Sequence, residues 1–203
     1  MVIAGKKTIR MLDTSCGDFV WMSRFLKTRQ DIFYTGVDVV PDLIKHHKNR
    51  YGGYTQWRFI HADILDPSFS MKNYDLIISR MTMQHLYFKD ISAILSKISS
   101  SGSQFALFTT FPGHHENQEL KITDENPGRF RFLNLELPPL CLTPPLCLQR
   151  DGPSDAFQGW DHFIGFWKQP LTSVKFCDRD NISTYRIKNT PVVVQTCSQV
   201  ETL

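Results

Sequence analysis

The segment Thr8–Trp21 (TIRMLDTSCGDFVW) most constrains what this chain can fold into. An apolar run ends at Asp13, small and turn-forming residues follow, and from Phe19 onward apolar residues recur with helical spacing. This order predicts a strand, a tight turn and a helix, which together make the first half of a βαβ unit. Such a turn presents backbone N–H groups at a helix N-terminus, where a ligand with acceptor atoms can bind.

The alternation of strand and helix continues to about residue 111. After a helix over 19–30, the sequence predicts strands over 33–39, 57–61, 74–79 and 104–111, and helices over 41–51 and 84–100. Further strands are expected at Arg131–Leu137 and His162–Lys168. This pattern is typical of a three-layer, Rossmann-like doubly wound α/β sheet that is mostly parallel with an antiparallel edge strand. The nearly continuous apolar run at 74–79 predicts a strand buried on both faces.

The chain of 203 residues, 41% hydrophobic and 21% charged, is long enough for one domain with its own core. We expect this domain to span residues 1–176 and to be followed by a polar extension at 177–203. Within the domain, residues 112–160 are rich in Pro, Gly, His and Asn. We therefore expect them to form an inserted loop or lid on the surface.

Charge and cysteine content exclude several classes of protein. The net charge is +3 and the basic residues are scattered, so nucleic-acid binding is not indicated. No apolar run approaches the roughly 18 residues of a membrane span. The five cysteines are odd in number and lack Cys-x-x-Cys spacing, which predicts neither a disulfide framework nor a structural metal. We therefore expect an intracellular protein of the reducing cytoplasm.

Three acidic residues follow three successive predicted strands: Asp13, Asp38 and Asp63. In an open parallel sheet, ligands bind outside the carboxyl ends of the strands. A carboxylate after the second strand can accept hydrogen bonds from both hydroxyls of a ribose. Asp63 can accept from an exocyclic amine while the Ile64 N–H donates to a ring nitrogen. Each acid singly also fits a helix cap or a turn, but three equivalent positions favour a ligand site.

The same segments resemble the motifs of class I S-adenosylmethionine-dependent methyltransferases. The resemblance covers about residues 8–112 in the family's order, and it is specific as a set. The segment 12–18 resembles the first motif, 36–38 the second, 62–64 the adenine-contacting motif, 74–86 the fourth, and 94–110 the helix, turn and strand that follow.

The resemblance implies that S-adenosylmethionine is the cofactor, S-adenosylhomocysteine the product, and that no metal is needed. It implies cofactor contacts at the ends of four strands. These are Asp13 near the sulfonium and ammonium, Ser15, Cys16 and Gly17 at the methionine part, Asp38 and Val39 at the ribose, Asp63 and Ile64 at the adenine, and Ser79 and Arg80 at the mouth. Electrostatics agrees for Asp13, because a carboxylate favours nearby cations directly or through water.

The chain departs from the family's pattern in two respects. Ser15 and Phe19 stand where the family usually has glycine, and Phe19 is expected to put bulk beside the cofactor loop. The family also usually carries helices before the first strand, whereas only seven residues precede Thr8 here. We expect either a shortened isoform or fragment, or a chain that takes the missing cover from a protein partner.

The methyl acceptor is not identified by the sequence. His85 is the best candidate for a catalytic base, because it is predicted to begin the helix after the fourth strand; capping or packing is the alternative. His114 and His115, which follow the fifth strand, and Trp160 in the predicted lid are candidate substrate contacts. Their alternatives are solvated loop histidines and an aromatic residue that covers the core.

Three functions are weighed. The leading one is a methyltransferase that passes a methyl group to its acceptor by in-line displacement, with positioning and desolvation supplying most of the rate. The alternative is a weakly active or inactive methyltransferase-like binding or regulatory subunit that needs a partner. A nicotinamide dehydrogenase ranks third, because the turn at 15–20 lacks Gly-x-Gly-x-x-Gly.

Overall fold

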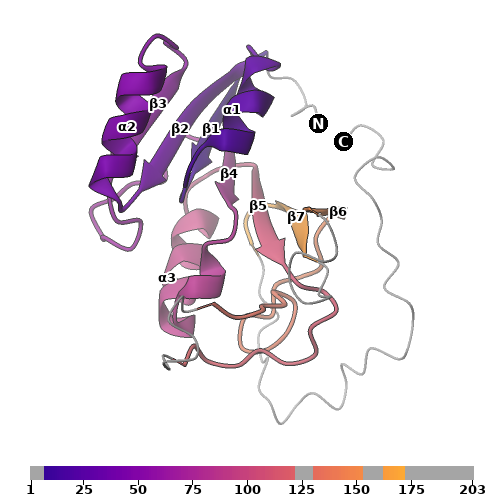
Figure 1. The fold of residues 1–203 in the computed structure, drawn as a ribbon. Coiled ribbons are helices and arrows are strands. Elements are labelled where there is room, and N and C mark those ends of the chain that lie inside the picture. Colours follow the sequence, from indigo (N-terminus) through magenta and orange to yellow (C-terminus); the bar gives the residue numbers. More distant parts are fainter. Residues whose placement is uncertain (1–6, 122–129, 153–161, 172–203) are drawn as a thin grey trace.

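In the computed structural model, residues 7–121, 130–152 and 162–171 are described. They form a seven-stranded sheet with the order β3-β2-β1-β4-β5-β7-β6 (Figure 1). Neighbouring strands from β3 to β5 are parallel, while β7 is antiparallel to both β5 and β6. This confirms the Rossmann-like sheet with an antiparallel edge. The strands are β1 (Ile9–Asp13), β2 (Ile32–Asp38), β3 (Trp57–His61), β4 (Leu76–Ser79), β5 (Phe105–Thr110), β6 (Cys147–Arg150) and β7 (Phe163–Lys168).

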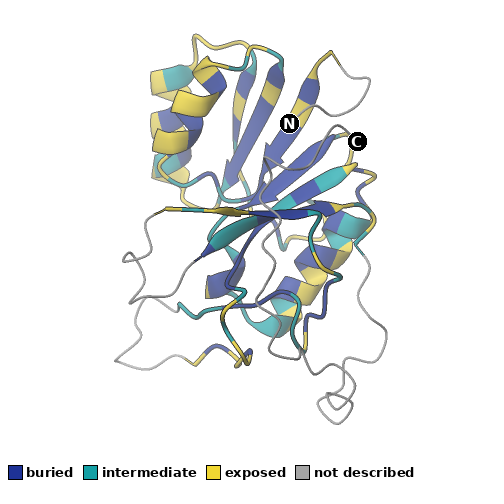
Figure 2. Ribbon diagram, turned by 90° about the vertical axis from the view of Figure 1, so that its right-hand side faces the viewer, coloured by how far each residue is buried: buried dark blue, intermediate teal, exposed yellow. Residues whose placement is uncertain are grey.

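Helices cover both faces of this sheet, which gives the three predicted layers. In Figure 2, α2 and α3 lie on opposite sides of the sheet. Apolar residues of α1 and α2 join the core on one face, and those of α3 join the core on the other. All residues of β4 are buried, as its apolar sequence predicted. The helices are α1 (Val20–Lys27), α2 (Pro41–Tyr51) and α3 (Phe88–Ser99).

The helix predicted over 84–100 begins later than expected. A 3₁₀ turn, η1 (Met83–His85), is followed by extended backbone at Leu86 and Tyr87, and α3 begins at Phe88. Two long-range contacts end the turn and begin the helix. Arg131 Nη2 donates to Leu86 O at 2.6 Å, and the Glu119 carboxylate accepts from the Phe88 N–H at 3.2 Å. Local spacing could not reveal either contact.

The strand predicted at Arg131–Leu137 is absent, whereas the one predicted at His162–Lys168 is confirmed as β7. Side chains replace the expected strand ladder, because Asn117 Nδ2 donates to Asn134 O at 2.7 Å and Asn117 Oδ1 accepts from Asn134 N at 2.9 Å. The described part of the predicted lid also contributes to the core beside α3 through Leu133, Leu135, Leu140 and Leu142. The sequence analysis missed β6.

Cys141 and Cys147 are disulfide-bonded, and Cys16 is a free buried thiol. The prediction that the cysteines form no disulfide framework is therefore contradicted by two of the three cysteines in the described residues. Pairing depends on the distance between Cα atoms in the fold, which sequence spacing does not give. The expectation of a reducing compartment consequently loses the observation on which it rested.

Within the described residues, no helix is long and apolar enough to cross a membrane.

Phe19 does not put bulk beside the cofactor loop, contrary to the sequence-based expectation. Its backbone adopts the left-handed conformation that glycine favours, with φ of 59°, and its ring is fully buried. The ring lies in an aromatic cluster on the α1–α2 face, which includes Tyr34, Tyr51, Trp57 and Phe59. The burial of this large ring offsets a backbone strain of about 1–3 kcal/mol.

We expect Phe19→Ala to lower the free energy of unfolding by about 3–5 kcal/mol, because it leaves a cavity and keeps the strained backbone. Urea denaturation followed by far-UV circular dichroism measures this. The matched control is Phe25→Ala on α1, whose side chain is 38% exposed; it should cost less than about 1 kcal/mol. A Phe19→Ala loss no larger than that of the control would contradict the packing role.

Candidate functional site

The loop after β1 is fixed between the two strands that flank β1. Thr14 N donates to Ile78 O and Cys16 N donates to Val37 O, each at 2.9 Å. Gly17 follows with φ of +50°, and a Cβ placed there would meet no atom within 4 Å. The loop therefore presents backbone to open space at the carboxyl edge of the sheet, which is the geometry a bound cofactor needs.

Asp38 ends β2 beside this loop. Its Oδ2 accepts from Gly17 N and its Oδ1 from Val40 N, both at 3.1 Å. Each carboxylate oxygen has a further lone pair, so Asp38 can also accept from two hydroxyls of a ribose. The neighbouring Val39 is 58% exposed, and this apolar surface would be covered by a bound nucleoside.

Asp63 and Ile64 follow β3, and Ala62 N donates to Asp38 O at 3.1 Å, which ties this turn to the end of β2. Asp63 is exposed, and its Oδ1 accepts from Leu65 N at 2.8 Å in a local turn. This turn is the alternative role that the sequence left open. It leaves Asp63 Oδ2 and the Ile64 N–H without partners among the described residues, so both can meet an adenine edge.

Asp13 is buried and faces inward instead of toward the open side of the loop. Tyr34 Oη donates to its Oδ2 at 2.9 Å, and Ser15 N donates to its Oδ1 at 3.3 Å. Burial raises the pKa of Asp13 to about 6, and the Tyr34 and Ser15 hydrogen bonds act in the lowering direction. Burial also raises the pKa of the Cys16 thiol, which therefore stays protonated at neutral pH.

Ser15 and Ser79 add hydroxyls at the carboxyl edges of β1 and β4. Ser15 Oγ forms a hydrogen bond with Thr82 Oγ1, which connects the two loops. Ser79 Oγ is buried and has no hydrogen-bond partner in the described part of the chain. A buried hydroxyl without a partner is costly, so Ser79 is suited to bond a ligand at this edge.

Arg80 is already engaged at the mouth of the site. Its guanidinium donates to both carboxylate oxygens of Asp151, at 2.7 and 3.1 Å, and lies 5.0 Å from the centre of the Trp21 ring. His162 Nε2 lies 3.9 Å from the same carboxylate. Arg80 thus connects the end of β4 to residues that follow β6 and precede β7.

The candidate acceptor side contains a group of rings that we call the aromatic patch: Phe111, Phe130, Phe132, His85 and His114. His85 is exposed and its ring centre lies 5.6 Å from that of Phe130, while His114 lies 5.8 Å from Phe132. Both Phe130 and Phe132 contact Phe111 directly after β5. Two of the histidines identified from the sequence therefore border one patch.

The remaining acceptor-side predictions have different outcomes. Burial lowers the pKa of His114, which keeps its imidazole neutral and able to accept a proton at neutral pH. His115 is exposed. Trp160 lies outside the described residues, as do residues 177–203 and the boundary at 176, so the role of Trp160 and the predicted domain division stay predictions.

Sequence reasoning missed several residues that build the site. His47 of α2 is buried and its Nε2 donates to Gly17 O at 2.7 Å, which ties the cofactor loop to α2. Tyr34, Asp151 and His162 orient Asp13 and Arg80, as described above. No local motif marks these residues, because each acts through a partner more than 10 residues away in the chain. In the described ranges, no three His, Cys, Asp or Glu side chains are grouped to hold a metal ion.

Comparison with known proteins agrees with this geometry. Residues 11–101 match the family model "Methyltransferase domain". The sequence matches none of the curated proteins compared with it. Residues 11–101 thus match a methyltransferase domain, and the sequence motifs and the fold are consistent with the class I methyltransferase family.

Solved structures show the same fold. The chain is similar to 1,6-didemethyltoxoflavin-N1-methyltransferase of Burkholderia thailandensis, solved with S-adenosylhomocysteine bound, at 18% identity and TM-score 0.59, covering 80% of this chain and 72% of that one. It is similar to the N-methyltransferase NodS of Bradyrhizobium japonicum WM9 at 14% identity and TM-score 0.58, covering 83% and 89%. The methyltransferase domain of bacterial CtHen1 gives 16% identity and TM-score 0.58, covering 80% and 90%.

Replacement of Asp13 by asparagine should change how stability depends on pH. The pKa of Asp13 in the folded chain, about 6, lies above its ordinary value of 3.8, so ionisation of this carboxyl opposes folding as pH rises between these values. Relative to Asp13→Asn, the wild-type free energy of unfolding should fall by about 2.5 kcal/mol between about pH 4 and about pH 7.

Urea denaturation of both chains at several pH values in this range measures the difference. The control is Asp42→Asn on the exposed first turn of α2, which removes a surface carboxylate and leaves the buried Asp13 site unchanged. A wild-type minus Asp13→Asn difference that stays constant across the range would show that Asp13 titrates normally in the folded protein.

Proposed function

We propose that this chain is an S-adenosylmethionine-dependent methyltransferase. The single observation that carries the proposal is the direct hydrogen bond between Gly17 N and Asp38 Oδ2 at 3.1 Å, which joins the open loop after β1 to the acid after β2. The methyltransferase domain match and the neighbour solved with S-adenosylhomocysteine support the same cofactor.

The donor and acceptor groups of the site fit the chemistry of this cofactor. Asp38 would accept from the ribose hydroxyls, Asp63 and the Ile64 N–H would recognise the adenine, and the backbone after Ser15 would face the methionine part. The buried Ser79 hydroxyl can satisfy its hydrogen bonding on the cofactor. When bound, S-adenosylmethionine supplies a sulfonium-activated methyl group.

The residues of the chain then position the acceptor and exclude water. The aromatic patch borders the carboxyl end of β5 and offers ring faces for an apolar acceptor. His114, kept neutral by burial, or the exposed His85 can take a proton from the acceptor atom as the methyl is transferred. The Arg80–Asp151 pair holds the segment after β4 against the segment after β6.

An inactive binding subunit gains no support from the structure. The bulk of Phe19 beside the cofactor loop was one argument for that alternative, and the ring is instead buried in the aromatic cluster of the core. The open space above Gly17 removes the expected steric conflict.

Isothermal titration calorimetry with S-adenosylhomocysteine tests the proposal on the full chain. We expect wild type to bind and Asp38→Ala to bind about 10- to 100-fold more weakly, because hydrogen bonds to a charged group are worth about 1.5–3 kcal/mol. Asp42→Ala, an exposed acid on α2, is the control and should bind like wild type.

Two outcomes would overturn the cofactor site. One is a folded wild-type chain that does not bind S-adenosylhomocysteine. The other is Asp38→Ala binding as tightly as wild type. Asp38→Asn separates charge from geometry, since its amide oxygen can still accept from Gly17 N. A screen of acceptors with S-adenosylmethionine, read by S-adenosylhomocysteine release, then identifies the substrate.

A further inference from the structure

The outer edge of β3 offers unpaired backbone. In the described part of the chain β3 pairs only with β2. Tyr34 N donates to Gln56 O and Ala62 N donates to Asp38 O. In a parallel ladder every second residue bonds to a given neighbour, so the even-numbered residues of β3 face β2. The backbone groups of the odd-numbered residues therefore point away from the sheet. Trp57 N already donates to Tyr54 O at 3.0 Å, so the N–H and C=O of Phe59 are the central groups that a partner can pair with.

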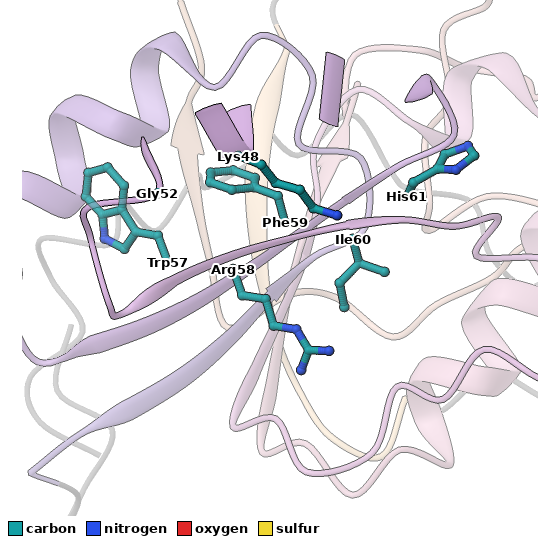
Figure 3. A pocket seen from close by; sticks show the side chains of 7 residues that line it. All are labelled: Lys48, Gly52, Trp57, Arg58, Phe59, Ile60 and His61. Atoms are coloured by element: carbon teal, nitrogen blue, oxygen red, sulfur yellow. The ribbon is translucent and has the colours of Figure 1, made fainter. Parts of the chain in front are cut away.

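A cavity of about 510 Å³ lies along this edge (Figure 3), lined by Lys48, Gly52, Trp57, Arg58, Phe59, Ile60 and His61. In Figure 3, Lys48 from α2 lies on the same side of the strand as Phe59, and Arg58 and Ile60 project from the opposite side. This arrangement follows from the alternation of side chains along a strand. The apolar part of the cavity is thus formed by Trp57, Phe59 and Ile60, which are buried or partly buried. Lys48 and Arg58 place one cation on each side of the strand.

The two cations are available for a partner. Lys48 and Arg58 are exposed, and within the described residues neither forms an ion pair. No acidic side chain lines the cavity. A ligand that pairs with the β3 backbone would therefore meet uncompensated positive charge on both faces of the edge.

We propose that an extended acidic segment of a partner protein binds here by adding a strand to β3. Main-chain hydrogen bonds to the outward groups of β3 would supply affinity, as in other cases of strand addition. Because neighbouring residues of a strand point to opposite faces, two consecutive acidic residues would reach Lys48 and Arg58 in turn. This inference goes beyond the proposed methyl transfer and does not depend on it.

Two other occupants fit the edge less well. A second copy of the chain would bring another edge with the same two cations and no acidic side chain in its cavity lining to pair with them, and like charges brought together are destabilising. A single-stranded nucleic acid meets the charges but has no peptide groups to pair with the outward N–H and C=O groups of Phe59. The peptide alone satisfies both features.

Calorimetry of the full chain with a synthetic peptide tests the proposal. The probe is an acetylated, amidated octapeptide of Thr and Val with Glu-Asp at its centre. We expect saturable one-to-one binding. The same peptide with Gln-Asn at the centre should bind about tenfold more weakly, since it loses two charge pairs of up to about 1 kcal/mol each. A version N-methylated on alternate residues should also lose at least about tenfold, because it cannot complete the strand ladder.

Variants of the protein locate the binding. The double change Lys48→Glu and Arg58→Glu should weaken binding of the acidic peptide by more than about tenfold. Lys45→Glu, an exposed cation of α2 that does not line the cavity, is the control and should change it less than about twofold. Circular dichroism and thermal unfolding establish that the variants fold, and S-adenosylhomocysteine titration shows separately whether the cofactor site is intact.

Four results would overturn the inference. These are no binding of the acidic peptide to the folded chain, equal binding of the N-methylated peptide, equal binding by the double variant, and displacement of the peptide by an oligo(U) RNA that itself binds more tightly. None of them bears on the cofactor site, whose titration is a separate measurement.

Discussion

Two backbone hydrogen bonds, from Thr14 to Ile78 and from Cys16 to Val37, fix the loop on which the site depends. They are available because β1 lies between β4 and β2, so the chain that leaves β1 finds an acceptor on each side. The loop therefore keeps its shape without relying on a ligand. Asp38 and His47 bond to the N–H and the C=O of Gly17 and complete this support. A loop whose backbone is fixed in this way is preorganised for a ligand.

Two groups of this arrangement are unfavourable by themselves, and packing on the α1–α2 face stabilises both. Phe19 holds a strained backbone, and Asp13 is a carboxyl removed from water. Both are stabilised by the same core, because the Phe19 ring contacts Tyr34 and the Tyr34 hydroxyl bonds to Asp13. The packing of the aromatic cluster, the backbone strain at Phe19 and the protonation of Asp13 are thus linked. A change in the aromatic cluster would therefore alter the conformation of the cofactor loop. Unfavourable local conformations are common at functional loops, where the surrounding packing and hydrogen bonds hold them in place.

The carboxyl edge of the sheet and its outer edge serve different chemistry. The carboxyl edge gathers acids, hydroxyls and the aromatic patch, which suit a cationic cofactor and an apolar acceptor. Distant segments also meet at this edge, since Arg80 after β4 pairs with Asp151 after β6. The outer edge at β3 instead offers backbone groups and the cations Lys48 and Arg58. Cofactor and proposed peptide partner would therefore bind at separate places on one rigid sheet.

The sequence by itself determined the elements whose signals are local. Apolar runs and turn residues predicted β1 to β5, α2 and the positions of Asp13, Asp38 and Asp63, because strand periodicity and helix starts depend on nearby residues. The tertiary structure alone decided where side chains point and which distant groups meet. It turned Phe19 into the core, held Arg80 on Asp151, replaced the strand predicted at Arg131–Leu137 by hydrogen bonds to Asn117, and bonded Cys141 and Cys147 in disulfides. Each depends on contacts between residues far apart in the chain, which local spacing does not encode.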